Sequence, residues 1–240
     1  MITFVVTLKS GGDFKPFDAI TLARQVRRHM RIPHRFVCMT DMAESFTTNP
    51  AMPYLIELEQ GWPGWWSMIE MFQLAGPVIA SGLDMIVLDD IDRLAELAMS
   101  CPMNVFYMAR PQPKPHKKGE KWCSGLQIWN GDWHWLYTIF KSNPKFYMEE
   151  FIKEQRFTYW HLMEHDHVEI RAVQDYFDGY YSYKNDCKKG KPDDARVVLF
   201  HGHPRPNQIR ERWVKDVYNN QYKYAHPMET IKNEANQAFR

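Results

Sequence analysis

Four aspartates stand close together near the middle of this 240-residue chain, within residues 77–94. Asp84 closes one short apolar run, and Asp89, Asp90 and Asp92 follow a second. Short apolar runs bounded by turn residues are typical of buried strands. An acid at the carboxyl end of such a strand lies at the edge where open α/β sheets bind ligands. Asp84 is therefore a candidate ligand-binding residue, and capping of a turn is the alternative explanation.

A second polar group follows a late apolar run at residues 196–200. It comprises His201, Gly202 and Arg205, with Arg205 between two prolines. A carboxylate and an imidazole at neighbouring strand ends are ligands that Mn²⁺ or Mg²⁺ accepts, and such a cation neutralises a diphosphate leaving group. Gly202 lets backbone N–H groups approach phosphate oxygens, and Arg205 suits bidentate phosphate binding. We therefore expect Asp84 and His201 to form a metal site; a core histidine before a structural turn is the alternative.

Composition narrows the class of protein. Hydrophobic residues make up 45% of the chain, enough for a sizeable core, and the formal net charge of +1 provides no global field that attracts nucleic acid. Membrane-spanning apolar runs are missing, the four cysteines are far apart, and the N-terminus lacks the basic region and cleavage site of a signal peptide. We expect a soluble protein of the reducing cytoplasm.

The elements that position these residues alternate along the chain. A β-branched strand at residues 2–8, an amphipathic helix at 17–30 and a strand at 35–41 form a βαβ unit, which implies a parallel sheet. Further strands are expected at 54–58, in the two apolar runs at 77–84 and 85–88, and at 103–109, 122–129, 180–184 and 196–200. Helices are expected at 65–76, 92–98 and within 132–163. Residues 110–121 contain three prolines and form a basic loop. We expect a single α/β domain over residues 1–240.

The chain resembles, nearly end to end, the GT-A fold glycosyltransferases. It is similar above all to the glycogenin and galactosyltransferase-like (family 8-like) enzymes of bacteria and phages. The motifs that carry this resemblance are residues 6–12, 35–41, 64–67, 82–84, 123–125, 182–184 and 200–206. The last of them, taken with the strand of Asp84, is the most specific. The resemblance implies a single-domain GT-A (Rossmann-like) fold with a mostly parallel, mixed central sheet flanked by helices.

The resemblance also implies roles for individual residues. Those expected to bind the nucleotide-sugar are Thr7, Leu8, Lys9, Asp84, Ser124, Gly125, His201, Gly202 and Arg205. Asp84 and His201 are in addition the implied ligands of Mn²⁺ or Mg²⁺. The family carries a downstream Asp-Gln pair near the reacting sugar carbon. Residues 164–167 match that pair best, which makes Asp166 the implied catalytic residue.

Three positions depart from the family pattern. Gly82 stands where the first Asp of the DxD metal motif is expected, so one metal ligand is lost and metal binding should be weaker. Met68 replaces a lysine, which removes a phosphate or sugar contact, and His167 replaces the glutamine of the Asp-Gln pair.

The function that the resemblance implies is metal-assisted transfer of a sugar from a nucleotide-sugar, expected to be a UDP-sugar, to an acceptor hydroxyl, with retention of anomeric configuration. Two acceptors remain open. One is a saccharide, and the other is a hydroxylated base in DNA, in which case a phage enzyme would work in the host cytoplasm. The basic loop at 110–121 fits a polyanionic acceptor, whereas the low net charge argues against tight nonspecific binding of DNA.

Two other functions compete with this reading. A non-catalytic nucleotide-sugar-binding module of the same fold would explain Gly82 and Met68. A zinc peptidase is suggested by His161, Glu164 and His165, which fit the H-x-x-E-H pattern. Such a zinc site needs a third protein ligand, for which Glu234 is only a weak candidate.

Overall fold

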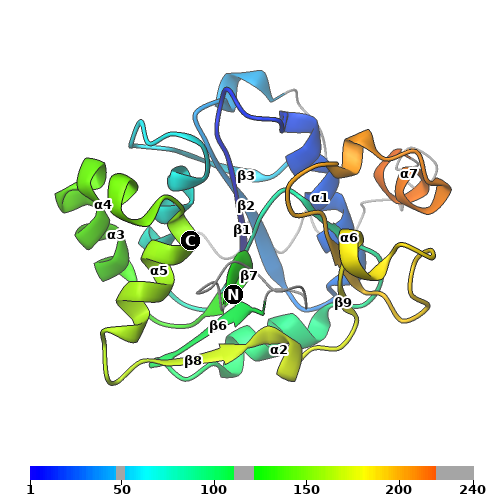
Figure 1. Ribbon diagram of the computed structural model, residues 1–240. Helices are drawn as coiled ribbons and strands as arrows, with labels where there is room; N and C mark the ends of the chain where they lie inside the picture. Colours follow the sequence, from blue (N-terminus) through cyan, green and yellow to red (C-terminus); the bar gives the residue numbers. More distant parts are fainter. Residues whose placement is uncertain (47–51, 111–121, 220–240) are drawn as a thin grey trace, which may run out of the picture.

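The computed structural model describes residues 1–46, 52–110 and 122–219, and its centre is a seven-stranded sheet with the order β3-β2-β1-β4-β7-β6-β8 (Figure 1). The strands are β1 (Ile2–Leu8), β2 (His34–Thr40), β3 (Tyr54–Glu57), β4 (Val78–Ser81), β6 (Val105–Ala109), β7 (Cys123–Trp129) and β8 (Glu169–Ala172). Within this sheet only β7 runs antiparallel to its neighbours. The predicted mostly parallel, mixed sheet is therefore confirmed.

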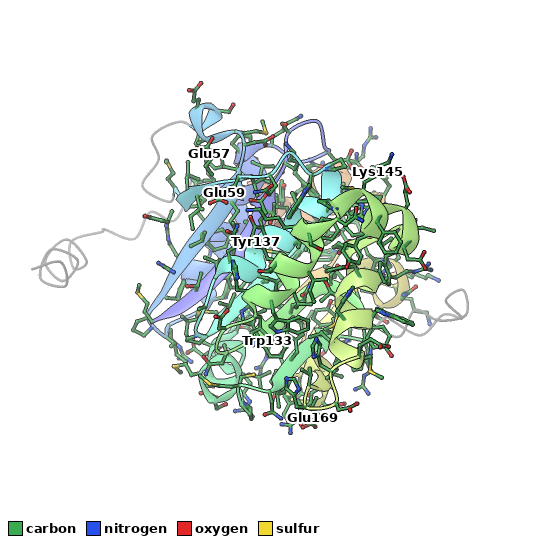
Figure 2. All side chains as sticks on the ribbon, turned by 90° about the vertical axis from the view of Figure 1, so that its left-hand side faces the viewer. Glu57, Glu59, Trp133, Tyr137, Lys145 and Glu169 are labelled. Atoms are coloured by element: carbon green, nitrogen blue, oxygen red, sulfur yellow. The ribbon has the colours of Figure 1, made fainter. Side chains whose placement is uncertain are left out.

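Helices cover both faces of the sheet because its strands are apolar on both sides. In β1, Phe4 and Val6 join the core under α1 (Pro16–His29) and α2 (Asp92–Ser100), whereas Val5 points into the opposite core. That second core lies under η2 (Gly64–Gln73), α3 (His134–Ser142), α4 (Pro144–Phe151) and α5 (Glu154–Met163). Figure 2 shows this second helical layer from outside, with Trp133 just before α3 and Tyr137 within it; both side chains are buried.

A second, three-stranded sheet has the order β5-β10-β9. Its strands are β5 (Met85–Val87), β9 (Tyr180–Ser182) and β10 (Val197–Leu199), and α6 (Tyr183–Asp186) and α7 (Arg212–Asn219) lie next to it along the chain. Ile86, Val198 and Phe200 share a small core with Val214 of α7. Three short 3-10 helices complete the described elements: η1 (Ala43–Ser45), η3 (Val173–Asp175) and η4 (Pro206–Gln208).

Most predicted elements are present within a few residues of their expected bounds, and two differ. The predicted helix at 65–76 is the 3-10 helix η2, which a similar apolar spacing produces. Strand β8 was not predicted, because it has only four residues and three of them remain partly or fully exposed. The predicted basic loop at 110–121 lies, except for Arg110, outside the described residues.

Within the described ranges, no helix has the length and apolarity needed to cross a bilayer.

Two glycines share a positive φ but differ in their surroundings. Gly179 (φ +80°) precedes β9, and a Cβ there would lie 2.6 Å from the Asp194 carbonyl oxygen; at Gly11 (φ +80°) a Cβ would meet no atom within 4 Å. Left-handed backbone costs an L-residue roughly 1–2 kcal/mol, and overpacking adds about 1–3 kcal/mol. We expect Gly179→Ala to lower the unfolding free energy by about 3 kcal/mol, and Gly11→Ala by only about 1 kcal/mol. Urea denaturation measures both values, and equal losses would contradict this account.

Candidate functional site

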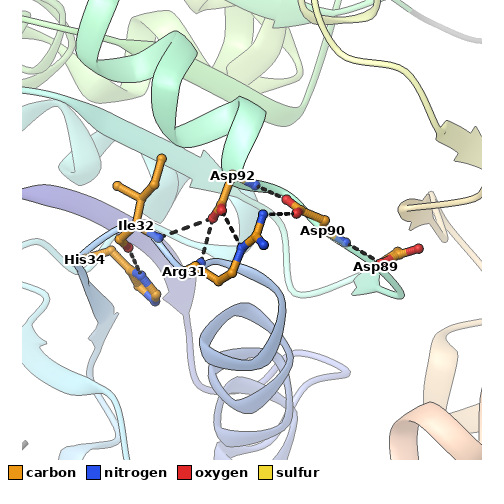
Figure 3. Close-up of polar contacts among 6 residues, drawn as sticks. All are labelled: Arg31, Ile32, His34, Asp89, Asp90 and Asp92. Carbon is orange, nitrogen blue, oxygen red and sulfur yellow. Dashed lines mark hydrogen bonds and ion pairs between the residues drawn. The ribbon is translucent and has the colours of Figure 1, made fainter.

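The acidic cluster that follows β5 has a structural role. Asp92 accepts hydrogen bonds from the Arg31 backbone N–H at 2.6 Å and from Arg31 Nε at 2.8 Å, and Asp90 forms an ion pair with the same guanidinium (Figure 3). The backbone N–H of Asp92 donates to Asp90, and that of Asp90 donates to Asp89. These acids therefore connect the end of α1 to the start of α2. Of the four aspartates, only Asp84 remains a candidate for ligand binding.

Asp84 lies in the turn between β4 and β5, at the carboxyl edge of the large sheet. Antiparallel pairing of β5 with β10 brings this turn to Phe200, whose N–H donates to the Asp84 carbonyl oxygen at 2.7 Å. The Arg205 Nη1 atom then lies 3.2 Å from Asp84 Oδ2. Burial raises the pKa of Asp84 to about 6, although the charge of Arg205 opposes that rise. The structure thus brings Asp84 into contact with Arg205, whereas the sequence analysis had paired Asp84 with His201.

Arg205 is held from three sides. Besides the contact with Asp84, its Nε donates to Asp13 Oδ2 at 3.1 Å, and its guanidinium lies 4.9 Å from the centre of the Phe14 ring. Asp13 and Phe14 belong to the loop between β1 and α1. The loop that follows the first strand therefore meets the turn that follows the last one, which orients a guanidinium at the carboxyl edge of the sheet.

His201 and Gly202 lie on the same turn as Arg205. The Nε2 atom of His201 lies 2.6 Å from the Oγ of Ser182, a buried residue at the end of β9. Gly202 has a φ of +69°, and a Cβ there would lie 3.1 Å from Lys184 Nζ. The missing side chain thus lets the ammonium group of Lys184 lie against the backbone of this turn. Lys184 is a cation that the resemblance did not assign to the site.

The three residues predicted around the base and ribose differ in what they offer. The Oγ1 atom of Thr7 is buried and has no hydrogen-bond partner among the described residues. Leu8 is 1% exposed and packs in the core, so its side chain is not available to a ligand. Lys9 forms an ion pair with Asp41. Burial alone would raise the pKa of Asp41, but hydrogen bonds from Lys9 and Ser10 lower it to about 2.

Ser124 lies near the amino end of antiparallel β7, which places it at the same edge of the sheet as Asp84. Its hydroxyl donates to the carboxylate of Glu154, the first residue of α5, and Glu154 is 6% exposed. A Cβ at Gly125 would lie 2.6 Å from Leu199 Cδ2. The missing side chain of Gly125 therefore accommodates the packing of β10, and its predicted contact with a sugar stays a prediction.

The structure separates Asp166 from the other candidates. It is exposed, in the segment that precedes β8, and β8 runs parallel to β6. The segment therefore lies at the amino edge of the sheet, opposite Asp84. Figure 2 shows this separation by its labels: Glu169, at the start of β8, and Glu57, at the end of β3, lie at opposite ends of the molecule. Parallel pairing of an unpredicted strand is the physical reason for the difference.

Glu154, which is followed by Gln155, is an acid that does reach the site. Glu154 contacts Ser124 across the sheet edge, and Gln155 is half-buried beside it. The adjacent Glu-Gln letters were visible in the sequence, but nothing there showed that α5 begins at β7. Sequence reasoning therefore missed this pair.

Other buried polar atoms at this edge lack partners. Among the described residues, Ser81 Oγ at the end of β4 and the Tyr180 hydroxyl in β9 make no hydrogen bond. Burial raises the pKa of Tyr180, and the nearby charges of Cys123 and Asp84 raise it further. Unpaired buried hydroxyls are costly unless a ligand or water satisfies them. Together with Thr7, they are buried hydroxyls at this edge that a polar ligand would satisfy.

The predicted metal ligands do not provide a donor set for a divalent cation. The carboxylate of Asp84 already binds the cationic Arg205, His201 Nε2 lies against Ser182, and Gly82 supplies no ligand. Across residues 1–46, 52–110 and 122–219, no three His, Cys, Asp or Glu side chains are grouped so that they could hold a metal ion. A hard divalent cation needs several oxygen ligands, so the described residues do not fit the implied Mn²⁺ or Mg²⁺ site.

The same finding bears on the zinc-peptidase alternative. His161 and His165 belong to no metal-binding group among the described residues, and Glu234 lies outside them. The Nδ1 atom of His161 lies 2.9 Å from the Phe157 carbonyl oxygen, and the His165 ring packs 4.3 Å from Trp135. Both histidines are therefore explained as packing residues of the helical layer.

The pH dependence of stability tests the burial of Glu154. Burial raises the pKa of Glu154, against the opposing effect of the Ser124 hydrogen bond. A carboxyl group whose pKa is raised by folding stabilises the protein fully below its unfolded-state pKa, and this contribution is lost as pH rises through the folded-state value. We therefore expect Glu154→Gln to gain unfolding free energy relative to wild type between pH 4 and pH 8 in urea denaturation. A pH-independent effect of Glu154→Gln would contradict the burial argument.

Comparisons with known proteins address the fold. No family model and no curated protein matches the sequence. Among solved structures, the galactosyltransferase LgtC, determined with donor and acceptor sugar analogs, has a TM-score of 0.61 and 11% identity over 95% of this chain and 98% of its own. An active-site mutant of LgtC has a TM-score of 0.59 and 10% identity, with the same coverage. The glycosyltransferase GlyE of Streptococcus pneumoniae TIGR4 has a TM-score of 0.53 and 12% identity, over 92% of this chain and 62% of its own. The chain thus has the GT-A fold of LgtC, as the sequence resemblance predicted.

Proposed function

We propose that this protein is a glycosyltransferase that moves a sugar from a nucleotide-sugar, most simply a UDP-sugar, to an acceptor hydroxyl. The observation that carries this proposal is the meeting of two groups at one sheet edge. Arg205 and Lys184 are cations suited to a diphosphate, and Glu154 with Ser124 forms a buried polar group suited to a sugar. Gly82 N–H donates to Gly125 O at 3.3 Å and so links the turn of Asp84 to β7. Support also comes from the GT-A fold, since LgtC was determined with donor and acceptor sugar analogs.

The proposed chemistry follows from the charges at this edge. When the bond between the anomeric carbon and the diphosphate breaks, negative charge develops on the leaving oxygen. Arg205 and Lys184 are placed to stabilise that charge, because charge-assisted hydrogen bonds to phosphate are strong in a partly buried site. Positive charge develops on the sugar, and the negative charge of the Glu154 carboxylate stabilises it. The acceptor hydroxyl forms the new bond to the anomeric carbon, and its proton passes to the departing diphosphate oxygen. No step is assigned to a metal ion, since the donor set does not fit one.

Three further features belong to this proposal. We take residues 1–240 as one domain, retention as the anomeric outcome, and the cytoplasm as the location. All four cysteines lie within the described residues and are free thiols, as expected in a reducing compartment.

Thr7, Ser81 and the Tyr180 hydroxyl are buried donors that a bound nucleotide-sugar would satisfy.

A non-catalytic nucleotide-sugar-binding module is the second candidate. Gly82 favours it, because one acid of the expected metal motif is missing. The buried Glu154 favours an enzyme instead. A buried carboxylate lowers stability above its unfolded-state pKa, and residues of that kind cluster at functional sites. Turnover separates the two candidates, since the binding module would bind donor without consuming it.

Two matched variants test the enzymatic proposal. We expect wild-type protein to hydrolyse at least one of a panel of UDP-sugars slowly, which chromatography of released UDP measures. Glu154→Gln should reduce this rate at least 100-fold, because it removes a charge that stabilises the transition state. Asp166→Asn should stay within twofold of wild type. The reverse order would show that Asp166 holds the role, and donor binding without hydrolysis by wild type would favour the binding module.

The salt dependence of binding distinguishes the two acceptors. The net charge of +1 favours a neutral saccharide, because a DNA acceptor requires neutralisation of several phosphates. We expect acceptor affinity, measured by calorimetry with saccharide acceptors, to change less than twofold between 50 and 200 mM NaCl. The expectation would be contradicted if duplex DNA bound tightly at low salt and its affinity fell roughly 1,000-fold across that range.

A further inference from the structure

We propose that this chain binds the donor's diphosphate with cationic side chains in place of a divalent metal, with Arg205 occupying the position that the metal would take on Asp84. This inference rests on the proposed function, because it concerns how the same donor is held. It also departs from the metal-assisted site that the sequence resemblance implied. Its basis is the arrangement of Gly82, Asp84, Arg205 and Lys184.

The first observation is the direction of the Asp84 side chain. A Cβ on Gly82 would lie 2.4 Å from Asp84 Oδ1, far inside van der Waals contact. The Asp84 carboxylate thus occupies the space that a side chain at position 82 would need. A second acid at position 82 and the present Asp84 conformation exclude each other. The absence of an acid at position 82 is therefore linked to the conformation of Asp84.

The second observation is what faces that carboxylate. The side chains of Asp84 and Arg205 are only 17% and 19% exposed, and their charged atoms lie 3.2 Å apart. Asp13 and the Phe14 ring hold the guanidinium from the other side. A cation therefore already lies on Asp84, fixed by groups from the opposite end of the chain. A divalent ion on the same carboxylate would lie beside the like charge of Arg205, which disfavours it.

The third observation is the bonding capacity that remains. A guanidinium has five N–H donors. Arg205 uses one at Nε for Asp13 and one at Nη1 for Asp84, so three remain for phosphate oxygens. Lys184 adds an ammonium group against Gly202, and it forms no ion pair within the described part of the chain. Lys184 of α6 and Arg205 of the turn after β10 thus place two cations side by side with Gly202. Two cations match the charge of a diphosphate, which is the role that a bound metal otherwise serves.

The decisive experiment is calorimetric titration of UDP into wild-type protein, after dialysis against EDTA and again with 1 mM Mn²⁺. We expect the two dissociation constants to agree within threefold. Tightening of more than tenfold by Mn²⁺ would overturn the inference and leave the proposed function intact. If neither UDP nor ADP, GDP, CDP or TDP bound under either condition, the proposed function would fail, and this inference with it.

A pair of variants at position 82 tests the steric part of the inference. Both Gly82→Asp and Gly82→Ala place a Cβ against Asp84 and displace its carboxylate from Arg205, but only the aspartate adds a metal ligand. We expect Mn²⁺ to tighten UDP binding at least tenfold in Gly82→Asp and less than threefold in Gly82→Ala. Equal responses to Mn²⁺ in the two variants would contradict the inference. Circular dichroism spectra of both variants establish that each is folded.

Discussion

The pairing of β5 with β10 is the constraint on which the candidate site depends. It joins Met85 to Leu199 in antiparallel register and places the Phe200 N–H on the Asp84 carbonyl oxygen. The two segments are more than a hundred residues apart in the sequence, so this ladder alone brings the acid of the first to the turn of the second. Gly125 is part of the same constraint, because only a residue without a side chain lets Leu199 pack over β7.

Buried charge is the second property that organises this edge of the sheet. Asp84 and Glu154 are both carboxylates that burial makes harder to ionise, and each has one polar partner, Arg205 and Ser124 respectively. Arrangements of this kind are seldom optimal for stability, because desolvation offsets much of the Coulomb attraction. They are common where a protein binds or transforms a charged ligand. By contrast, Arg31 and its acids lie largely at the surface and tie loops together, which contributes little to stability.

The likeness to LgtC concerns architecture more than chemistry. A TM-score of 0.61 at 11% identity means that the strand order and helical layers correspond while few side chains do. One fold accommodates different ways of meeting the same electrostatic demand, since function resides in the site rather than in the sheet. In the function proposed for this chain, the demand is the negative charge of a diphosphate. The groups available to meet it are a guanidinium on Asp84 and an ammonium group beside Gly202.

The sequence by itself determined the elements and the motif residues. Apolar periodicity and turn residues predicted the βαβ start, the two strands around Asp84 and the late strand before His201, because these signals are local. It did not determine which polar residues meet. The resemblance pointed to Asp166, and Glu154 was not considered. Strand β8, short and partly exposed, has no clear sequence pattern, and its parallel pairing with β6 places Asp166 at the sheet edge opposite Asp84. Tertiary structure alone decided the Asp84–Arg205 contact, the role of Gly125 and the burial of Glu154, since each depends on strand pairings between distant segments that no local signal encodes.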